Sequence, residues 1–300
     1  MRKSVRNKLA LCFFATTTLA TSPLAHPGSG LEIDRSGQIF FLDTGSGLWK
    51  LDTLGKLTHL SPMRYHWLAL DEKNQFTSTR LSSSLGDISK AGNNPTTLLS
   101  SDYPVAVGKD GDFYYPFYSS GKVQMKRVLP SGETTVLVTL PDSSLWYWQH
   151  VTHINGLAAG PDSSLYYTEH NGIRKISKDG RVSVYAIVAA LVIGPSIPGV
   201  EQRPYLRDLD VDSNGVIYVA DNGDARVLKI TPDLEITTLV QTQSPWAPTA
   251  VAQFRGDVYV LEFSHTEGDD RTKWMPRIRK ITPDGKSSII LTVDQMPGAR

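Results

Sequence analysis

Short runs of apolar residues recur along most of the chain, and Gly, Asp, Pro or Ser ends each of them. The runs are rich in Val, Ile, Tyr, Phe and Thr, and apolar positions at helical spacing are nearly absent. This composition and punctuation are typical of β-strands joined by turns. One Ala-rich stretch, Ala186 to Ile193, departs from the pattern and is stopped by Gly194-Pro195. The sequence therefore predicts an all-β protein.

The apolar runs group into six similar units, which begin near residues 30, 66, 104, 154, 206 and 248. The third run of a unit and its following turn repeat most clearly, as in Ile173-Arg-Lys-Ile-Ser-Lys-Asp-Gly180, Val227-Leu-Lys-Ile-Thr-Pro-Asp233 and Ile278-Arg-Lys-Ile-Thr-Pro-Asp-Gly285. A four-stranded unit of roughly 40–45 residues that repeats around a ring is a β-propeller blade. We expect a six-bladed β-propeller of four-stranded antiparallel blades. In the second unit the expected strands are 66–70, 75–79 and 96–99.

The first 25 residues differ from the rest. Four basic residues precede the apolar stretch Leu9 to Ala20, and small residues follow it. This order predicts a secretory signal peptide over residues 1–25, cleaved after Ala20 or Ala25. A membrane anchor is the alternative, but the stretch is shorter than the roughly 20 residues that a span needs. We expect an exported protein, periplasmic or secreted, with one propeller domain over residues 26–300.

Charge and cysteine content narrow the expected partners and the means of stabilisation. The net charge of the 300-residue chain is +1, which gives no electrostatic case for a nucleic acid or, after signal cleavage, a membrane partner. The single cysteine, Cys12, lies in the predicted signal peptide. The mature domain would then contain no disulfide and would depend on its core and its strand ladders.

Three stretches resemble known propeller families. Gly215-Val-Ile-Tyr-Val-Ala-Asp-Asn-Gly-Asp-Ala-Arg-Val-Leu-Lys-Ile230 resembles an NHL repeat. Asn155-Gly-Leu-Ala-Ala-Gly-Pro-Asp162 resembles the SMP-30/gluconolactonase-like family, and Tyr167-Thr-Glu169 with Ile173-Arg-Lys-Ile176 is similar to blades of the virginiamycin B lyase type. The resemblance spans about residues 30 to 293 and implies a six-bladed fold. These families contain hydrolases, lyases and binding proteins, so the activity stays open.

The resemblance also implies a place for a site. The gluconolactonase-like enzymes hold a divalent cation at the top of the central channel with a Glu, an Asn and an Asp from the starts of inner strands. The corresponding ring positions in this chain are Ser29, His66, Tyr103, Asn155, Arg207 and Thr249. Asn155 matches the family, but Arg207 stands at the Asp position and Ser29 at the Glu position. Glu32 and Asp208 are out of phase and should point elsewhere unless a bulge corrects the register.

Several other side chains are candidates for the site. His153 and His170 lie near Asn155 and Glu169 in the fourth unit, where they would serve as a general acid and base or help to hold a metal. The alternative is that they are ordinary exposed loop histidines. Trp146 and Trp148, in the loop 141–153, would give a ligand apolar contact area, or fill seams between blades. We expect Trp67, which stands within a strand pattern, to fill a seam.

Charged residues near the predicted mouth have two interpretations each. Arg207 would pair with an anionic ligand group, or with Asp208, Asp210 or Glu201. Asp43, Asp221 and Glu262 end second strands and would complete a cation site, or cap turns. The basic residues of the third strands are expected to form a solvated outer face, and these are Arg174, Lys175, Lys229, Arg279 and Lys280.

These observations favour a binding function. We expect a small polar ligand or a protein segment at the top of the channel, contacted by the six ring residues, Trp146 and Trp148, without a cofactor. The alternative is a metal-dependent hydrolase or lyase of the gluconolactonase-like class. In it His153 or His170 would be catalytic, and Asn155, Glu169 and Asp208 would hold Ca²⁺, Mg²⁺ or Zn²⁺. A scaffold that presents its rim to other proteins is the third possibility.

Overall fold

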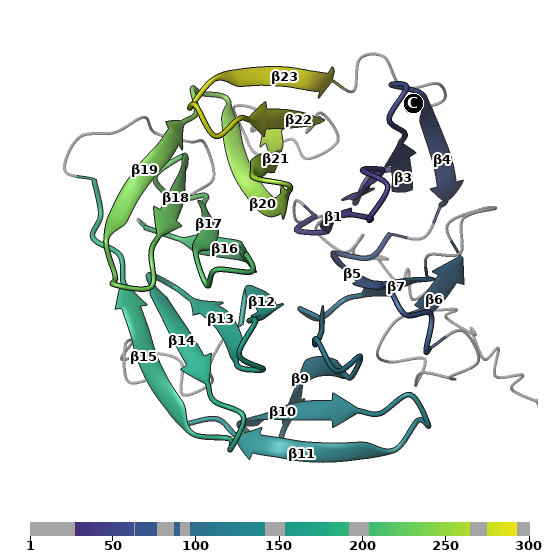
Figure 1. Ribbon diagram of the computed structural model, residues 1–300, viewed down its shortest axis with the longest axis vertical. Coiled ribbons are helices and arrows are strands. Elements are labelled where there is room, and N and C mark those ends of the chain that lie inside the picture. The colour runs from purple at the N-terminus through teal and green to yellow at the C-terminus, as the bar shows by residue number, and fades with distance from the viewer. Residues whose placement is uncertain are drawn as a thin grey trace, which may run out of the picture.

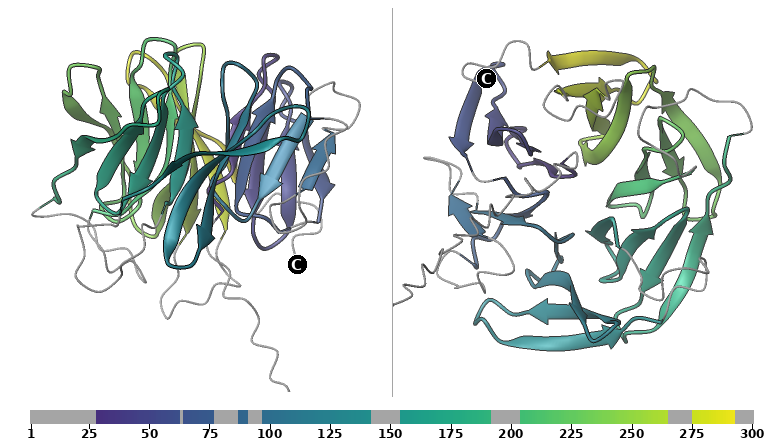
Figure 2. Two further views of the ribbon diagram at one scale, coloured as in Figure 1. Left: turned by 90° about the horizontal axis from the view of Figure 1, so that it is seen from below. Right: turned by 180° about the vertical axis from the view of Figure 1, so that it is seen from behind.

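The structure, a computed structural model, describes residues 28–62, 64–76, 87–90, 97–141, 154–191, 204–264 and 275–292. These residues form six antiparallel sheets arranged in a ring around a central channel (Figure 1). The sheets stand side by side around the ring axis in the side view (Figure 2). No helix of the described part is long and apolar enough to cross a membrane.

Five sheets are four-stranded, and in each the strands follow the chain order outward from the channel. Their strands are β1 (Leu31–Ile33), β2 (Ile39–Asp43), β3 (Gly47–Leu51) and β4 (Leu57–Ser61); β8 (Ala106–Val107), β9 (Phe113–Ser119), β10 (Lys122–Val128) and β11 (Thr134–Thr139); β12 (Gly156–Ala159), β13 (Leu165–Glu169), β14 (Gly172–Ile176) and β15 (Val182–Ile187); β16 (Leu206–Val211), β17 (Ile217–Asp221), β18 (Arg226–Ile230) and β19 (Ile236–Gln241); β20 (Trp246–Phe254), β21 (Asp257–Ser264), β22 (Pro276–Ile281) and β23 (Ser287–Thr292). The predicted propeller class and the four-stranded antiparallel blade are confirmed.

The second unit of the sequence, which lies between the sheet β1–β4 and the sheet β8–β11, differs from the prediction. It contains β5 (Trp67–Asp71), β6 (Asp87–Lys90) and β7 (Thr97–Ser101) in the spatial order β5-β7-β6. The segment 75–79 was expected to be its second strand, but residues 75 and 76 form a turn and β7 pairs with β5 instead. The side chain of Phe76 is fully buried although the residue lies in the turn. Its apolar character therefore reflects core packing and not a strand.

The hydrophobic core lies in the seams between neighbouring sheets. Each of the six larger clusters of buried apolar residues joins two adjacent sheets. The ring closes in the same way, because Phe41 and Trp49 of the first sheet pack in one cluster with Leu261 and Phe263 of the last. Every four-stranded sheet comes from one contiguous segment, as the sequence predicted, so apolar packing rather than an exchanged strand joins the first of these sheets to the last.

A β-bulge recurs at the same place in all five four-stranded sheets, between the third and the fourth strand. The register shifts after Leu48, Met125, Ile173, Val227 and Ile278. A bulge strengthens the local twist and makes an exposed edge a poorer template for pairing with another chain. This matters because the outer strands β11, β19 and β23 carry no charged residue.

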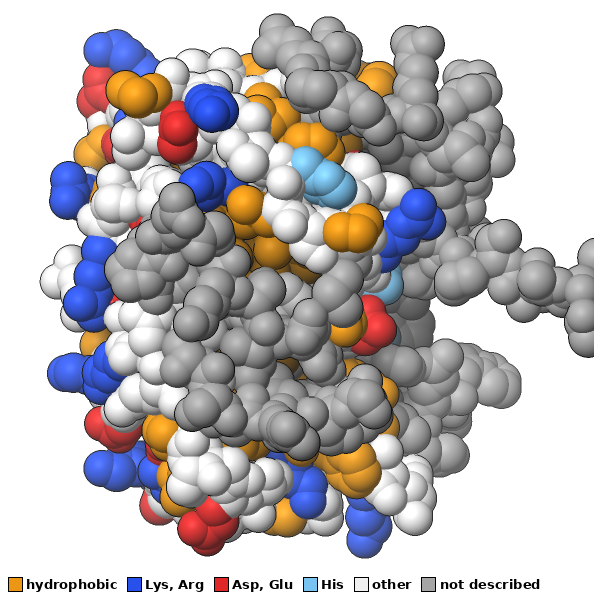
Figure 3. All heavy atoms as spheres, turned by 90° about the vertical axis from the view of Figure 1, so that its right-hand side faces the viewer, with side chains coloured by type: hydrophobic (Ala, Val, Ile, Leu, Met, Phe, Trp, Pro, Cys, Tyr) orange, Lys and Arg blue, Asp and Glu red, His pale blue; other side chains and the backbone are white. Residues whose placement is uncertain are grey.

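Charges on the surface are mixed in sign. On the face drawn in Figure 3, Lys and Arg side chains lie along one margin with Asp and Glu side chains among them. Two lysines of the third strands show how such charges are held. Lys175 pairs with Asp162 and lies over the ring of Tyr166, while Lys280 pairs with Asp257. These lysines are half-exposed and fit the predicted solvated face.

Candidate ligand-binding site in the central channel

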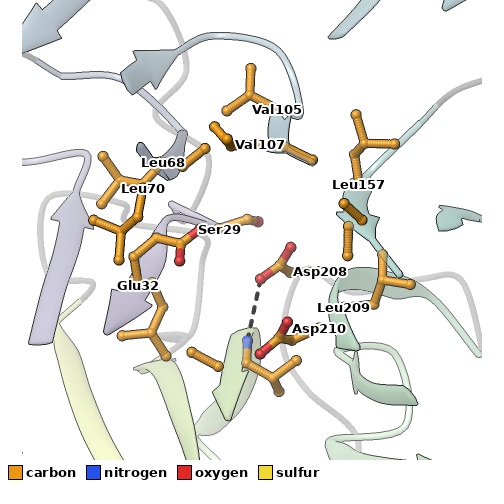
Figure 4. Close-up of a pocket in the computed structure, with 17 residues that line it drawn as sticks. Ser29, Glu32, Leu68, Leu70, Val105, Val107, Leu157, Asp208, Leu209 and Asp210 are labelled. Carbon is orange, nitrogen blue, oxygen red and sulfur yellow. Dashed lines mark hydrogen bonds between the residues drawn. The ribbon is translucent and has the colours of Figure 1, made fainter. Parts of the chain in front are cut away.

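A cavity of about 140 Å³ lies in the central channel (Figure 4). Its lining comes from the innermost strands of all six sheets, and most of the residues in it have apolar side chains. Leu68 and Leu70 stand on one side, and Leu157 and Leu209 on the other. Its ionisable lining residues are Glu32, Asp208 and Asp210. The cavity is therefore lined mainly by apolar residues, and its carboxyl groups face the interior (Figure 4).

A bulge in β16 explains how two consecutive charged residues reach the channel. Leu206 pairs with Asp221 and Leu209 pairs with Val219, so Arg207 and Asp208 together lie opposite a single residue of β17. Two residues against one break the strict alternation of side chains along a strand. The exception made for a bulge therefore applies to Asp208. For Glu32 the prediction is wrong, because Glu32 lines the cavity although β1 pairs with β2 without a bulge.

The three carboxyl groups differ in their partners. Asp208 Oδ2 accepts a hydrogen bond from the backbone N of Val251 at 3.3 Å, and Asp210 Oδ2 accepts one from that of Gln253 at 2.7 Å. These bonds tie β16 to β20, the inner strand of the next sheet. Glu32 stands on the opposite wall, and its carboxylate is directed into the space between (Figure 4).

Burial and mutual repulsion change the acidity of these groups. Burial raises the pKa of the Glu32 carboxyl well above its usual range, and the carboxyls of Asp210 and Asp208 raise it further. Burial also raises the pKa of Asp208 well above its usual range, and raises that of Asp210. The backbone N–H groups and Arg207 oppose the shift at Asp208. The cavity therefore favours a proton, or a donor group on a ligand, beside these oxygens.

At the mouth of the cavity, Arg207 reaches across the channel. Its Nε donates to Oγ of Ser29, which lines the cavity from the first sheet, at 3.4 Å. The Thr168 hydroxyl holds the carbonyl of Arg207 from the fourth sheet. Burial lowers the pKa of the guanidinium, although Asp208 opposes this. The structure thus brings together Arg207 and Ser29, two of the predicted ring residues.

Asn155 lies at the same mouth, but its side chain is engaged within the protein. Its Nδ2 donates to the carbonyl of Leu206 at 2.9 Å, and its Oδ1 accepts from the hydroxyl of Tyr205 at 3.3 Å. The Nε1 of Trp67 donates to the carbonyl of Asn155 at 2.9 Å. Trp67 also packs against the seam next to its own sheet, as predicted. Asn155 therefore connects the second, fourth and fifth units around the mouth.

The other ring positions do not line the cavity. Thr249 is the extra residue of a second bulge, in β20, and its buried hydroxyl donates to the carbonyl of Leu261 at 3.3 Å. His66 Nδ1 lies 3.0 Å from Asp102 Oδ1. The ring of Tyr103 stacks on that of Tyr118, with their centroids 6.0 Å apart.

His170, the described candidate for an acid–base role, has a positive φ of 52° and accepts the backbone N–H of Leu206 with its carbonyl. The other predicted candidates Trp146, Trp148 and His153 lie outside the described residues.

Acidic residues at the ends of second strands are held by neighbours in their own sheet. Asp43 accepts from the backbone N of Gly45 and from the Ser46 hydroxyl, which is the predicted turn cap. Asp221 pairs with Arg226, and Glu262 pairs with Arg277 and Arg279.

Glu169 of the fourth sheet pairs with Arg174. The arginines at 174 and 279 are thus mostly buried ion-pair partners, and the prediction that they form a solvated face is wrong for both.

The described residues contain no group of three or more His, Cys, Asp and Glu side chains placed to hold a metal ion. The residues proposed for a cation also separate in space: Glu169 faces Arg174, Asn155 is bonded to Leu206, and Asp208 lies in the cavity. Sequence reasoning named Asp210 only as a partner of Arg207. Its alternation with Asp208 along β16 was the pattern that pointed to two carboxyls on one side of a strand.

Comparisons with known proteins place the fold but not the activity. No family model matches the chain, and no curated protein matches its sequence. Among solved structures, virginiamycin B lyase from Staphylococcus aureus has a TM-score of 0.51 and 16% identity, over 88% of this chain and 83% of the lyase. Regucalcin from Agrobacterium tumefaciens str. C58, described as a calcium-binding protein, has a TM-score of 0.51 and 15% identity, over 81% of this chain and 84% of that chain.

A third similar structure is the PQQ-bound form of aldose sugar dehydrogenase from Streptomyces coelicolor. It has a TM-score of 0.52 and 13% identity, over 85% of this chain and 94% of the dehydrogenase. At such low identity the likeness shows a shared fold alone. The chain is therefore a β-propeller with structural neighbours of the virginiamycin B lyase and SMP-30/gluconolactonase-like kinds, and its resemblance to NHL repeats stays a prediction.

Proposed function

We propose that the protein binds a small polar ligand at the mouth of its central channel. The contact of Arg207 with Ser29 above a carboxyl-lined cavity carries this proposal. The guanidinium offers donors to an acceptor or anionic group of the ligand. Beneath it, Glu32, Asp208 and Asp210 accept hydrogen bonds from hydroxyl or ammonium groups.

The size of the cavity favours a small ligand over a protein segment. A cavity of about 150 Å³ holds a molecule of the size of benzene, so the cavity of about 140 Å³ admits a group of similar size. A larger ligand would place one end in the cavity and leave the rest at the mouth. Small hydroxy acids, amino acids and sugar acids combine the acceptor and donor groups that these walls require.

The experiment is a thermal-shift screen of such compounds, followed by calorimetric titration of those that raise Tm. Arg207→Gln removes the guanidinium at the mouth, and we expect a loss of affinity of at least tenfold. Arg255→Gln is the matched control, because Arg255 lies in the exposed hairpin between β20 and β21 and stacks on Phe254. Equal affinity of the wild type and Arg207→Gln for every compound found would refute the proposal.

The metal-dependent hydrolase or lyase is the second candidate. Its support is coarse and comes from the shared fold with virginiamycin B lyase and regucalcin. The hydrogen bonds of the Asn155 side chain to Tyr205 and Leu206 argue against this candidate. Asn155 Oδ1 already accepts a hydrogen bond from Tyr205, so it is not available to bind a cation together with Asp208. Elemental analysis of the purified protein tests this candidate directly, since a resident cation would be found in stoichiometric amount.

Two further parts of the proposal concern the chain as a whole. The three-stranded sheet is the second blade of a six-bladed ring, which the six interblade clusters support.

Residues 1–25 are removed on export, and the basic-then-apolar order of the first 20 residues supports this. Amino-terminal sequencing of protein from the periplasm or the medium tests the second part, and a mature chain that still begins at Met1 would contradict it.

A further inference from the structure

Four sheets carry an acidic residue at the same register position, at or near the end of the second strand. In each of these sheets, the residue four positions before the acidic residue pairs with the last residue of the third strand. All four side chains are buried, and they are Asp43, Glu169, Asp221 and Glu262. A buried carboxylate is stable only when donors satisfy its oxygens, so these positions can be compared with one another.

In the fifth and sixth units, both oxygens of the carboxylate have donors. Asp221 Oδ2 accepts from Nε of Arg226 at 2.8 Å, and its Oδ1 accepts from two backbone N–H groups. Glu262 Oε1 accepts from Nε of Arg279 at 2.5 Å, and its Oε2 accepts from Nε of Arg277 at 2.5 Å. The first unit also satisfies both oxygens, through the turn that follows its strand.

Glu169 of the fourth unit is different. Its Oε2 accepts from Nε of Arg174 at 3.2 Å, whereas its Oε1 has no hydrogen-bond partner among the residues that the structure describes. The side chain is only 2% exposed, so bulk solvent does not replace the missing donor. Leaving a buried acceptor unpaired destabilises the folded protein, and a suitable donor would remove that penalty on binding.

The sequence of the third strand explains the missing donor. Arg226 and Arg277 each pair across the ladder with the acidic residue itself. The residue that pairs in this way with Glu169 is Gly172. Arg174 stands instead at the position of Arg279, one of the two arginines that hold Glu262. The fourth unit therefore has one guanidinium where the sixth has two.

The open oxygen faces a seam, not the channel cavity. Thr168 directs its hydroxyl to the carbonyl of Arg207 in the fifth unit, and adjacent strand residues point to opposite faces. Glu169 therefore lies on the face of β13 that carries Tyr167, which packs in the cluster between the third and fourth units. Burial raises the pKa of Tyr167, and the negative charge of Glu169 raises it further.

We propose that Glu169 Oε1 is the anchor of a second binding site, which takes a guanidinium or primary ammonium group of a small ligand. The group would occupy the place that an arginine side chain takes beside Asp221 and Glu262. Because the site lies in the seam between the third and fourth sheets and Glu169 does not line the channel cavity, it does not depend on the ligand proposed for the channel.

The test uses methylguanidinium chloride as the probe and neutral methylurea as its isosteric control. The purified full chain is titrated with each and followed by ¹H–¹⁵N NMR. We expect methylguanidinium to bind and methylurea not to bind. Glu169→Gln should weaken methylguanidinium binding at least tenfold. Glu133→Gln, which neutralises an exposed carboxylate, should leave it unchanged.

A second variant keeps the test decisive if Glu169→Gln does not fold. Gly172→Arg supplies the guanidinium from within the chain, and Gly172 is not among the glycines with a positive φ, so its backbone accepts a side chain. This variant should lose methylguanidinium binding and melt at a higher temperature than the wild type. The proposal is overturned if the wild type does not distinguish the two probes, or if Gly172→Arg binds methylguanidinium as well as the wild type does.

Discussion

Arg207 and Ser29 meet across the channel, with Nε of one 3.4 Å from Oγ of the other, although 178 positions separate them in the chain. The contact joins the first and fifth sheets and covers the side of the cavity at which both inner strands begin. The structure therefore confirms that these two ring positions share one end of the channel. The presence of Arg207 does not remove acidic groups from the channel, because Glu32, Asp208 and Asp210 line the cavity beneath the guanidinium.

The Glu32 carboxyl should make stability depend on pH. Burial raises its pKa in the folded state, so the folded chain retains a proton that the unfolded chain loses above about pH 4.3. The free energy of unfolding therefore falls as the pH rises through the folded value. Glu32→Gln removes this loss, and we expect the variant to be more stable than the wild type at pH 8 and equal to it at pH 3. Urea titrations across that range measure the difference, and a gain that is the same at every pH would contradict the assignment.

The ion pair of Asp221 and Arg226 should matter far more than an exposed pair. Asp221 is fully buried, and its loss leaves the buried guanidinium of Arg226 without its carboxylate. We expect Asp221→Ala to lower the free energy of unfolding by about 3–5 kcal/mol. The control is Glu72→Ala, which breaks the exposed pair with Arg35 and should cost less than about 1 kcal/mol. Denaturant titrations of both variants test this contrast, which fails if the two losses are similar.

Closure of the ring by apolar packing predicts a large effect at Phe263. Its ring is buried in the cluster that joins the last sheet to the first. Phe263→Ala should lower the free energy of unfolding by about 3–5 kcal/mol. Phe117, which is 42% exposed on β9, is the matched control, and its replacement by Ala should have a much smaller effect. Similar losses for the two variants would show that this seam contributes little to the closed ring.

Substitutions at two glycines of the first unit distinguish the effect of steric crowding from that of backbone conformation. Both Gly47 and Gly55 have a positive φ, which costs other residues about 1–2 kcal/mol. A Cβ at Gly47 would also lie 2.1 Å from the carbonyl oxygen of Ser61, whereas a Cβ at Gly55 would meet nothing within 4 Å. Gly47→Ala should therefore lower Tm by clearly more than Gly55→Ala. Thermal melts of the two variants decide the point, and equal shifts would mean that the backbone relaxes at Gly47.

Much of the fold could be predicted because it is encoded locally. A β-branched run that ends in Asp-Gly or Pro-Asp specifies a strand and its turn without reference to the rest of the chain, so the repeated Ile278-Arg-Lys-Ile-Thr-Pro-Asp-Gly285 pattern predicted the blades correctly. The second sheet could not be predicted in this way. The pairing of β5 with β7 joins two strands that are not consecutive in the chain, and Phe76 has the same apolar character in a turn as in a strand.

The sequence alone determined the repeat, the ring positions and the place of Arg207 among them. Tertiary structure decided which side chains share the channel, because a bulge at Arg207 and Asp208 shifts the alternation that strand periodicity assumes. It also decided that one oxygen of Glu169 has no donor among the described residues, since a hydrogen bond depends on where a neighbouring strand places its donors. Turns depend on interactions between a few neighbouring residues, so they can be predicted from the sequence. Strand register and ion pairs between strands form only when the blades pack, so they require the tertiary structure.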